Sequence, residues 1–316
     1  MKLRQLGNSE MQVAPLMFGG NVFGWTADTA TSFSILDAFV GHGFNFIDTA
    51  DVYARWVPGN HGGESETVLG EWFARSGKRD EVVLATKVGM DLGDGKKGLA
   101  GKYILEAAEA SLRRLKTDYI DLYQSHVDDA TVPLDETLRA YQKLIEQGKV
   151  RMIGASNYTG ARLREAVELA KREGLPVYQT LQPHYNLYDR QGFEQDQQPV
   201  ALELGIGVVP YFSLASGFLT GKYKTKEDSA GANRESRVAK YFDERGMKIL
   251  AALEEVSKET GAKIATISLA WLMAQPTILA PIASATSVAQ LEDLVAAPNL
   301  TLSEDALAKL TAASAY

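Results

Sequence analysis

The sequence predicts an α/β fold, a (β/α)8 TIM barrel, on two observations. Eight short apolar β-type runs alternate with amphipathic helical stretches, and no linker or low-complexity segment separates them. Continuous apolar runs of this kind are typical of parallel strands whose sheet is covered by helices. Eight consecutive units favour closure into a barrel, so we expect residues 1–316 to form a single barrel domain.

The elements are expected in a regular order along the chain. The strands are predicted at 16–19, 44–47, 82–86, 119–123, 150–154, 178–181, 206–210 and 277–281. The helices are predicted near 30–42, 64–75, 101–116, 134–147, 160–172, 196–204, 245–260 with 263–274, and 287–296, followed by a surface helix from Ser303. Two short strands around Gly7-Asn8 should form an N-terminal β-hairpin that caps the barrel bottom. A doubly wound open sheet is the main alternative, but no G-x-G-x-x-G opens any of these helices.

Composition narrows the classes of partner and chemistry. The chain has no cysteine, which excludes disulfides and thiol catalysis and fits a reducing cytoplasm. A net charge of −7 without a basic run argues against nucleic acid and anionic membrane surfaces as partners. The stretch 264–291 is uncharged, but Pro276 and Pro281 interrupt it, and the N-terminus lacks the apolar core of a signal peptide. We therefore expect a cytoplasmic protein that does not associate with a membrane.

Polar residues stand where the predicted strands end. Asp48 and Tyr53 follow the second strand, Lys87 ends the third, and His126 follows the fourth. The later strands deliver further polar and aromatic residues, namely Ser156, Asn157, Gln182 and Tyr211. Because the carboxyl ends of barrel strands share one mouth, these side chains should converge there.

A carboxylate, Asp48, and an ammonium, Lys87, at the ends of two neighbouring strands suggest acid–base chemistry. Lys87 is the expected partner of Asp48, and a desolvated pair costs hydration energy that stability alone does not explain. A nearby ammonium favours phenolate, so Lys87 should loosen the proton of Tyr53 and make it a general acid. Taken singly, each residue has an ordinary structural explanation: a rim lysine, a packed tyrosine or a hydrogen-bonded histidine. Their convergence favours a functional site.

Other chemistries fit the sequence poorly. The four histidines, His42, His61, His126 and His184, show no metal-ligand spacing, so no metal site is expected, although a metal-dependent barrel hydrolase stays a third alternative. No G-x-S-x-G nucleophile elbow occurs. What remains is proton transfer to a carbonyl, with a hydride source that the protein does not contain.

Several motifs in this order resemble the aldo-keto reductases. They include FIDTADVY, GGESETVLG, VVLATKVG, GKVRMIGASNY and LQPHYNLYDR, and the match runs nearly end to end. The similar branch contains bacterial general-stress reductases and potassium-channel β subunits. The resemblance implies reduction of an aldehyde or ketone to the alcohol with NAD(P)H. It implies Tyr53 as proton donor, Lys87 and Asp48 as its tuning groups, and His126 as the residue that orients the carbonyl.

The resemblance also implies a set of cofactor contacts. Ser156, Asn157 and Gln182 would hold the carboxamide and Tyr211 would stack on the nicotinamide, while Lys222 and Arg237 would meet the phosphates. Further contacts are implied for Gly20, Asn21, Asp48, Leu214, Ser284, Thr286, Gln290 and Asp293. Family members often carry a basic residue at Ser284, an arginine at Gln290 and an asparagine at Leu294, so the 2′-phosphate of NADPH loses usual partners here. NADP(H) is favoured, and NAD(H) or use of both stays open.

The substrate side and the assembly are less determined by the sequence. Trp25 and Trp56 lie in loops after the first two strands and suggest a partly apolar pocket for a small-molecule carbonyl, with Met90 and Val127 as possible neighbours. The alternative function is a redox-sensing, cofactor-binding subunit of a larger assembly with little turnover. The sequence does not indicate an oligomeric state.

Overall fold

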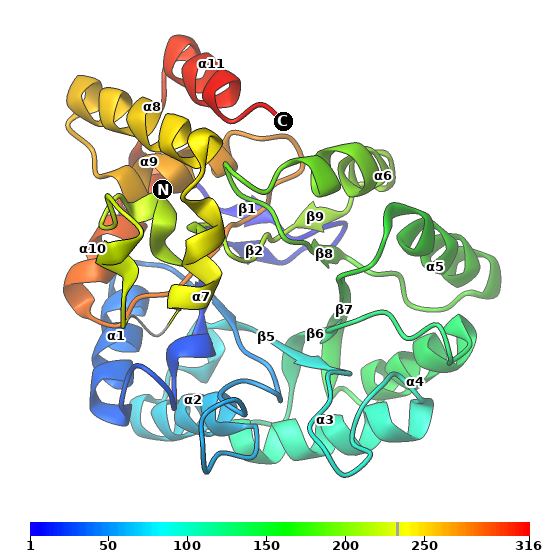
Figure 1. Ribbon diagram of the computed structural model, residues 1–316. Coiled ribbons are helices and arrows are strands. Elements are labelled where there is room, and N and C mark those ends of the chain that lie inside the picture. Colours follow the sequence, from blue (N-terminus) through cyan, green and yellow to red (C-terminus); the bar gives the residue numbers. More distant parts are fainter. Residues whose placement is uncertain (232–233) are drawn as a thin grey trace.

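Eight parallel strands form a curled sheet with helices on its outer face in a computed structural model that describes residues 1–231 and 234–316 (Figure 1). Neighbouring strands follow the order β10-β3-β4-β5-β6-β7-β8-β9, so from β3 to β9 each strand pairs with the next along the chain, and β10 pairs with β3. The strands are β3 (Met17–Gly19), β4 (Phe46–Asp48), β5 (Val83–Val88), β6 (Ile120–Ser125), β7 (Val150–Ser156), β8 (Thr180–Gln182), β9 (Gly207–Val208) and β10 (Ile282–Ala283). The predicted (β/α)8 barrel is confirmed.

The helices lie between the strands and mostly begin and end near the predicted positions. They are α1 (Thr29–Gly41), α2 (Glu64–Ser76), α3 (Gly101–Leu115), α4 (Leu134–Glu146), α5 (Gly160–Glu173), α6 (Gln198–Leu204), α7 (Glu235–Val238), α8 (Glu244–Thr260), α9 (Ile264–Met273), α10 (Val288–Val295) and α11 (Glu304–Ala313). Side chains such as Asp28 and Ser287 accept hydrogen bonds from the first-turn amides and so define where their helices begin. The predicted helix 196–204 differs, because its first part is a π-helical turn over Phe193–Gln197.

The prediction of the eighth strand at 277–281 is wrong, since the strand that pairs with β3 is Ile282–Ala283. Thr277 has a positive φ of 69°, and Pro281 has no N–H to donate to a ladder. The segment before β10 instead closes the barrel against β9. Leu279 N donates to Val208 O at 2.7 Å, and Ile282 N donates to Pro210 O at 2.9 Å.

The predicted N-terminal hairpin consists of β1 (Arg4–Gln5) and β2 (Gln12–Val13) in an antiparallel pair. Its Leu6 and Val13 are fully buried with the interior side chains of the barrel. Arg4 donates to the carbonyl oxygens of Met273 and Ile278, and this joins the hairpin to the last barrel unit. The hairpin therefore closes the end of the barrel opposite the strand carboxyl ends.

A long segment, residues 209–243, connects β9 to α8 and contains short helical turns together with α7. Residues of this segment line the cavity at the carboxyl ends of the strands. The uncharged stretch that the sequence placed at 264–291 divides into α9, the segment leading to β10, and the start of α10. Within residues 1–231 and 234–316, no helix combines the length and apolarity needed to cross a membrane.

Candidate active site

Three side chains from adjacent strand ends form one hydrogen-bonded group. Lys87 on β5 and Asp48 at the end of β4 are both buried, and Lys87 Nζ lies 2.7 Å from the carboxylate of Asp48. Lys87 Nζ also donates to Thr49 O at 2.8 Å and to Tyr53 Oη at 2.9 Å. The Tyr53 hydroxyl in turn donates to Asp48 Oδ2 at 2.9 Å. The structure therefore brings these three predicted residues together, and their register follows from the pairing of β4 with β5.

The pKa of Tyr53 differs from the expectation. The sequence suggested that Lys87 would loosen the phenol proton, whereas burial, the charge of Asp48 and the hydrogen bond to Asp48 raise the pKa of Tyr53 well above its usual range. Burial lowers the pKa of Lys87, while Asp48 opposes that shift. Desolvation outweighs the ammonium because the phenol lies in a buried environment. In the free protein, the Tyr53 hydroxyl is therefore firmly protonated.

His126 follows β6 and lies beside the tyrosine, with ring centroids 6.0 Å apart. Burial, and secondly the charge of Lys87, lowers the pKa of His126 well below its usual range, so the imidazole is neutral near pH 7. Its Nδ1 is buried and has no hydrogen-bond partner among the described residues. The ring also lines the cavity, where the N–H of a neutral imidazole can donate a hydrogen bond to a carbonyl oxygen.

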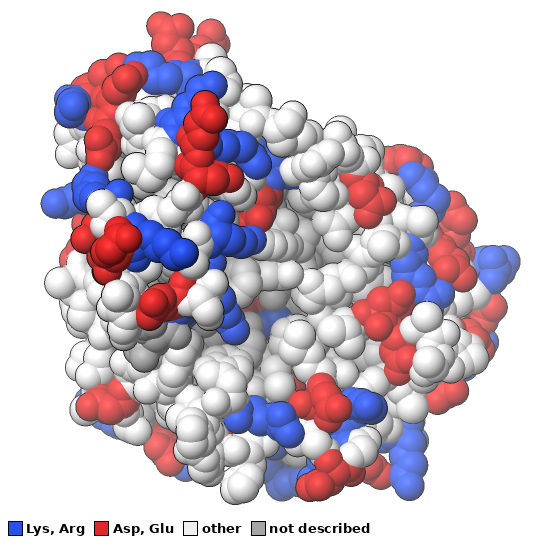
Figure 2. All heavy atoms as spheres, in the orientation of Figure 1, with Lys and Arg blue, Asp and Glu red and all other residues white. Residues whose placement is uncertain are grey.

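A cavity of about 1310 Å³ opens at the carboxyl ends of the strands, in the hollow seen face-on in Figure 2. Its lining includes Tyr53, His126 and Asp48. Of the other predicted site residues, it includes Asn21, Trp56, Ser156, Asn157, Gln182, Tyr211, Leu214, Lys222, Arg237, Ser284, Thr286, Gln290 and Asp293. Lys87, Gly20 and Trp25 do not line it. Lys87 lies behind Tyr53, and a Cβ on Gly20 would come within 2.9 Å of Asp48 O, so Gly20 packs against the backbone of the site.

The predicted carboxamide-binding residues are connected by hydrogen bonds. Ser156 Oγ donates to Gln182 O at 2.9 Å, and the amide nitrogen of Gln182 lies 3.1 Å from Asp48 Oδ1. Asn157 donates to His126 O at 2.9 Å and accepts from the Tyr211 hydroxyl at 2.9 Å. The wall of polar side chains is thereby held in one arrangement next to Tyr53.

Cationic side chains line the side of the cavity formed by the long segment and by α9. Lys222 and Arg237 lie there as predicted, and Figure 2 shows blue side chains along the rim of the hollow near α7. Sequence reasoning missed Arg234, one residue before α7, and Lys263, one residue before α9. Arg234 precedes α7 and its backbone is not helical, so helical spacing to Arg237 would not have found it.

Arg234 reaches the region where the sequence expected lost charge. The Asn21 side chain lies 2.6 Å from Ser284 Oγ, and its oxygen accepts from Arg234 Nη2 at 3.1 Å when the amide faces that way. Burial and the nearby Arg237 lower the pKa of Arg234. Gln290 Oε1 accepts from Thr286 N at 3.0 Å. The Asn21 side chain therefore links the guanidinium of Arg234 to the uncharged Ser284 in the lining of the cavity.

Apolar side chains form the remaining wall near Tyr53. Trp56 is half exposed, and its ring lies 6.2 Å from the ring of Tyr53. Met90 and Val127 also line the cavity, as suggested from the sequence. Trp25 packs edge-on against Trp56 with centroids 5.5 Å apart, so it supports this wall without forming it.

Known proteins are similar in sequence to this chain over nearly its whole length. The aldo/keto reductase family model matches residues 15–315. The chain is 36% identical to the uncharacterized oxidoreductase YrpG of Bacillus subtilis, over 98% of this chain and 95% of that protein. It is 33% identical to a probable voltage-gated potassium channel subunit beta of Arabidopsis thaliana, over 93% and 90% of the two chains. It is 30% identical to the norsolorinic acid reductase of Aspergillus flavus, over 97% and 79%. The chain belongs to the aldo/keto reductase family, whose members are oxidoreductases.

Proposed function

We propose that this protein reduces an aldehyde or ketone to the alcohol with NADP(H), and that Tyr53 donates the proton. The observation that carries the proposal is the bonded group of Tyr53, Lys87 and Asp48 at the wall of a deep cavity with cations along one side. When bound, the nicotinamide cofactor supplies the hydride. This chain's residues then have to hold the carbonyl, provide a proton and stabilise the charge that is left behind.

The contacts of Tyr53 suit a proton donor. Its raised pKa keeps the hydroxyl protonated until negative charge develops on the substrate oxygen. Once the proton has left, the phenolate lies 2.9 Å from Lys87 Nζ, and Asp48 keeps that ammonium in place. His126, which is neutral and lines the cavity beside Tyr53, can direct the same oxygen toward Tyr53. The proton is thus held at Tyr53 Oη and passes to an oxygen that His126 orients.

The cationic side of the cavity supports a phosphorylated cofactor. Three cations in the lining can meet phosphate oxygens, namely Lys222, Arg237 and Lys263. The same lining also contains one acidic residue, Asp293. Arg234, linked to Ser284 through Asn21, offers the charge that a 2′-phosphate needs where the family's usual basic residues are missing. We therefore propose preference for NADP(H) over NAD(H), carried mainly by Arg234.

A panel of carbonyl substrates tests the proposal directly. The purified protein would be mixed with aliphatic and aromatic aldehydes and ketones, and NADPH or NADH oxidation followed by absorbance. We expect steady turnover that is faster with NADPH and favours apolar carbonyls, because Trp56, Met90 and Val127 line the cavity near Tyr53. Lack of turnover above a Tyr53→Phe control with every substrate would contradict the proposal.

A second candidate function is a redox-sensing subunit, supported by the similarity to a potassium channel subunit beta. Such a subunit would bind the cofactor tightly but oxidise it very slowly. The two functions separate in one measurement. Single-turnover oxidation of bound NADPH by an aldehyde, compared with the steady-state rate, shows whether the protein releases product and turns over again.

A further inference from the structure

A tight turn in the long segment between β9 and α8 forms part of the cavity wall. The turn spans Ala215–Thr220, and its Ser216 and Gly217 line the cavity. The backbone is left-handed at three consecutive residues, with φ values of 47° at Ala215, 58° at Ser216 and 103° at Gly217. Residues other than glycine adopt this conformation at a cost in free energy, so contacts from outside the turn have to hold it.

The shape of this turn determines where Lys222 lies. Lys222 lines the cavity and is one of the cations that can meet phosphate oxygens. A Cβ on Gly217 would come within 3.1 Å of Lys222 Cε, so the lysine side chain passes close over the turn. The Lys222 amide also lies 3.4 Å from Thr220 Oγ1. A displacement of the turn would therefore displace the ammonium.

The turn is held from behind by an aromatic stack. The ring of Phe218, which is buried, stacks on the ring of Tyr241 with centroids 5.4 Å apart and an interplanar angle of 25°. The Tyr241 hydroxyl donates to Asp189 Oδ2 at 2.8 Å. On another side of the turn, Ser268 Oγ of α9 donates to Leu219 O at 3.0 Å. Neither Asp189 nor Tyr241 is among the described residues that line the cavity, so both lie behind its wall.

Asp189, in the loop after β8, receives several side chains besides Tyr241. Lys240 Nζ lies 3.0 Å from its carboxylate, and Asn186 Nδ2 donates to it at 3.1 Å. His184 Nε2 also lies 3.0 Å away. Burial alone would raise the pKa of this carboxyl, but the imidazole, the phenol and the ammonium hold the pKa well below its usual range. The Tyr241 hydroxyl therefore donates to an ionised acceptor, and such a bond is stronger than one between neutral groups.

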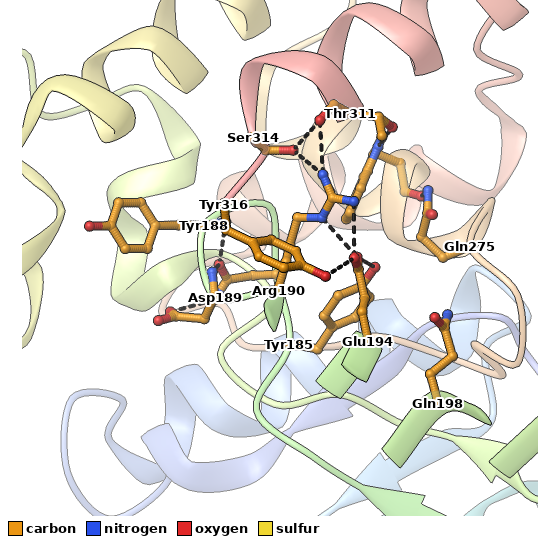
Figure 3. Close-up of polar contacts among 12 residues, drawn as sticks. Tyr185, Tyr188, Asp189, Arg190, Glu194, Gln198, Gln275, Thr311, Ser314 and Tyr316 are labelled. Carbon is orange, nitrogen blue, oxygen red and sulfur yellow. Dashed lines mark hydrogen bonds and ion pairs between the residues drawn. The ribbon is translucent and has the colours of Figure 1, made fainter. Parts of the chain in front are cut away.

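The loop that carries Asp189 is fixed to the rest of the protein. The next residue, Arg190, pairs through Nε with Glu194 at 2.7 Å (Figure 3). Its Nη1 donates to Thr311 O and Ser314 Oγ at the end of α11, both at 2.9 Å. The carboxylate that receives the Tyr241 hydroxyl is therefore anchored to the C-terminal helix.

We propose that Tyr241, through its bond to Asp189, is a positioning residue for the cofactor, because it fixes the Ala215–Thr220 turn and with it Lys222. This rests on the proposed function, in which Lys222 meets the cofactor phosphates. A wall that is already arranged in the free protein binds more tightly, since less conformational freedom is lost on binding. NADPH and NADH carry the same pyrophosphate, so this contribution should be equal for both. The proposed role of Arg234 differs, because it concerns the 2′-phosphate alone.

The test measures binding of both cofactors to Tyr241→Phe, which removes the hydroxyl and keeps the ring on Phe218. Dissociation constants for NADPH and NADH would be determined from quenching of tryptophan fluorescence. We expect both to rise by about three- to tenfold and by the same factor, since a hydrogen bond to a charged group is lost. The KM for an aldehyde at saturating NADPH should not change, because Trp56, Met90 and Val127 of other loops line the cavity near Tyr53.

A double-variant cycle shows whether the effect passes through Asp189. Asp189→Ala removes the acceptor together with the ion pair to Lys240, so it should weaken both cofactors at least as much as Tyr241→Phe. Adding Tyr241→Phe to Asp189→Ala should cause no further loss, because the bond between them is already gone. Losses that simply add would show that the hydroxyl does not act through Asp189, and would overturn the inference.

Another tyrosine–aspartate bond provides the matched control. The Tyr119 hydroxyl donates to Asp80 Oδ1 at 2.7 Å, and neither residue is among the described residues of the cavity lining. Tyr119→Phe should leave both dissociation constants unchanged. Native affinities in Tyr241→Phe, or a loss confined to NADPH, would refute the positioning role while leaving the proposed function intact. If the native protein binds neither cofactor, both the proposed function and this inference fall.

Discussion

Replacing Lys87 by methionine should destabilise the protein as well as inactivate it. The ammonium has no exposed area, lies 2.7 Å from Asp48, and makes two further hydrogen bonds to Thr49 and Tyr53. Without it, the Asp48 carboxylate stays buried, and among the described residues only the Tyr53 hydroxyl and the Gln182 amide remain as its partners. Removing one partner of a buried ion pair typically costs about 3–5 kcal/mol. We therefore expect the free energy of unfolding to fall by about that amount.

The double variant separates stability from chemistry. Adding Asp48→Asn to Lys87→Met removes the unpaired charge, so the double variant should be more stable than Lys87→Met alone by about 2 kcal/mol or more. Its carbonyl reduction should remain abolished, because a phenolate at Tyr53 would still have no ammonium beside it. Urea unfolding followed by circular dichroism gives the stability, and NADPH oxidation gives the activity.

A surface pair provides the control for this experiment. Lys149 pairs with Glu109, and both side chains are partly exposed. Lys149→Met should change the free energy of unfolding by less than about 1 kcal/mol, as exposed pairs usually do. If Lys87→Met is as stable as the native protein, or if the double variant is no more stable than Lys87→Met, the buried charge pair does not have the energetics argued here.

Four further outcomes are expected. Tyr53→Phe should lower carbonyl reduction by about 10²–10⁴-fold while leaving the dissociation constant for NADPH unchanged; a smaller loss with chemistry limiting would mean that another group donates the proton. Arg234→Gln should weaken NADPH binding about tenfold and NADH binding much less, in fluorescence titrations; equal losses would show that the guanidinium does not meet the 2′-phosphate. Burial holds the pKa of His126 low in the folded state, so the free energy of unfolding should fall as the pH drops below about 6.5, where only the unfolded chain takes up the proton. Urea unfolding at several pH values should show a smaller fall for His126→Asn than for the native protein. Gly70→Ala should lower the unfolding midpoint and cost about 1–3 kcal/mol, because its Cβ would lie 2.0 Å from a backbone oxygen of α3, whereas the control Gly41→Ala has no neighbour within 4 Å and should not destabilise.

Most of the barrel could be predicted because its signal is local. An apolar run followed by an amphipathic stretch reports one β-then-α unit, and helix starts such as Ser303 are marked by capping side chains. The eighth strand could not be placed, because Leu279 and Ile282 are equally apolar and both are buried. Which of them pairs with β3 depends on the φ of Thr277 and on the register with β9, and both are set by the closed barrel.

The sequence predicted that these side chains lie together at the strand ends, but it did not predict their electrostatics. The strand-end rule brought Asp48, Lys87 and His126 together from the sequence alone. The direction of the Tyr53 pKa could not be predicted, because it depends on how completely the hydroxyl is removed from water. Arg234 was missed because the long segment after β9 has no repeating pattern that shows which of its side chains turn inward.

The charged residues and the tryptophans around Tyr53 belong to different parts of the fold. Asp48 and Lys87 belong to paired strands, so a change of chain geometry there would disturb the whole barrel. Trp25 and Trp56 belong to connecting loops and meet through a single edge-on contact. Under the proposed function, a duplicated gene could therefore acquire a new carbonyl preference by altering loop residues alone while the proton-donating apparatus is inherited unchanged. Such a division makes the protein a favourable starting point for laboratory evolution of selectivity.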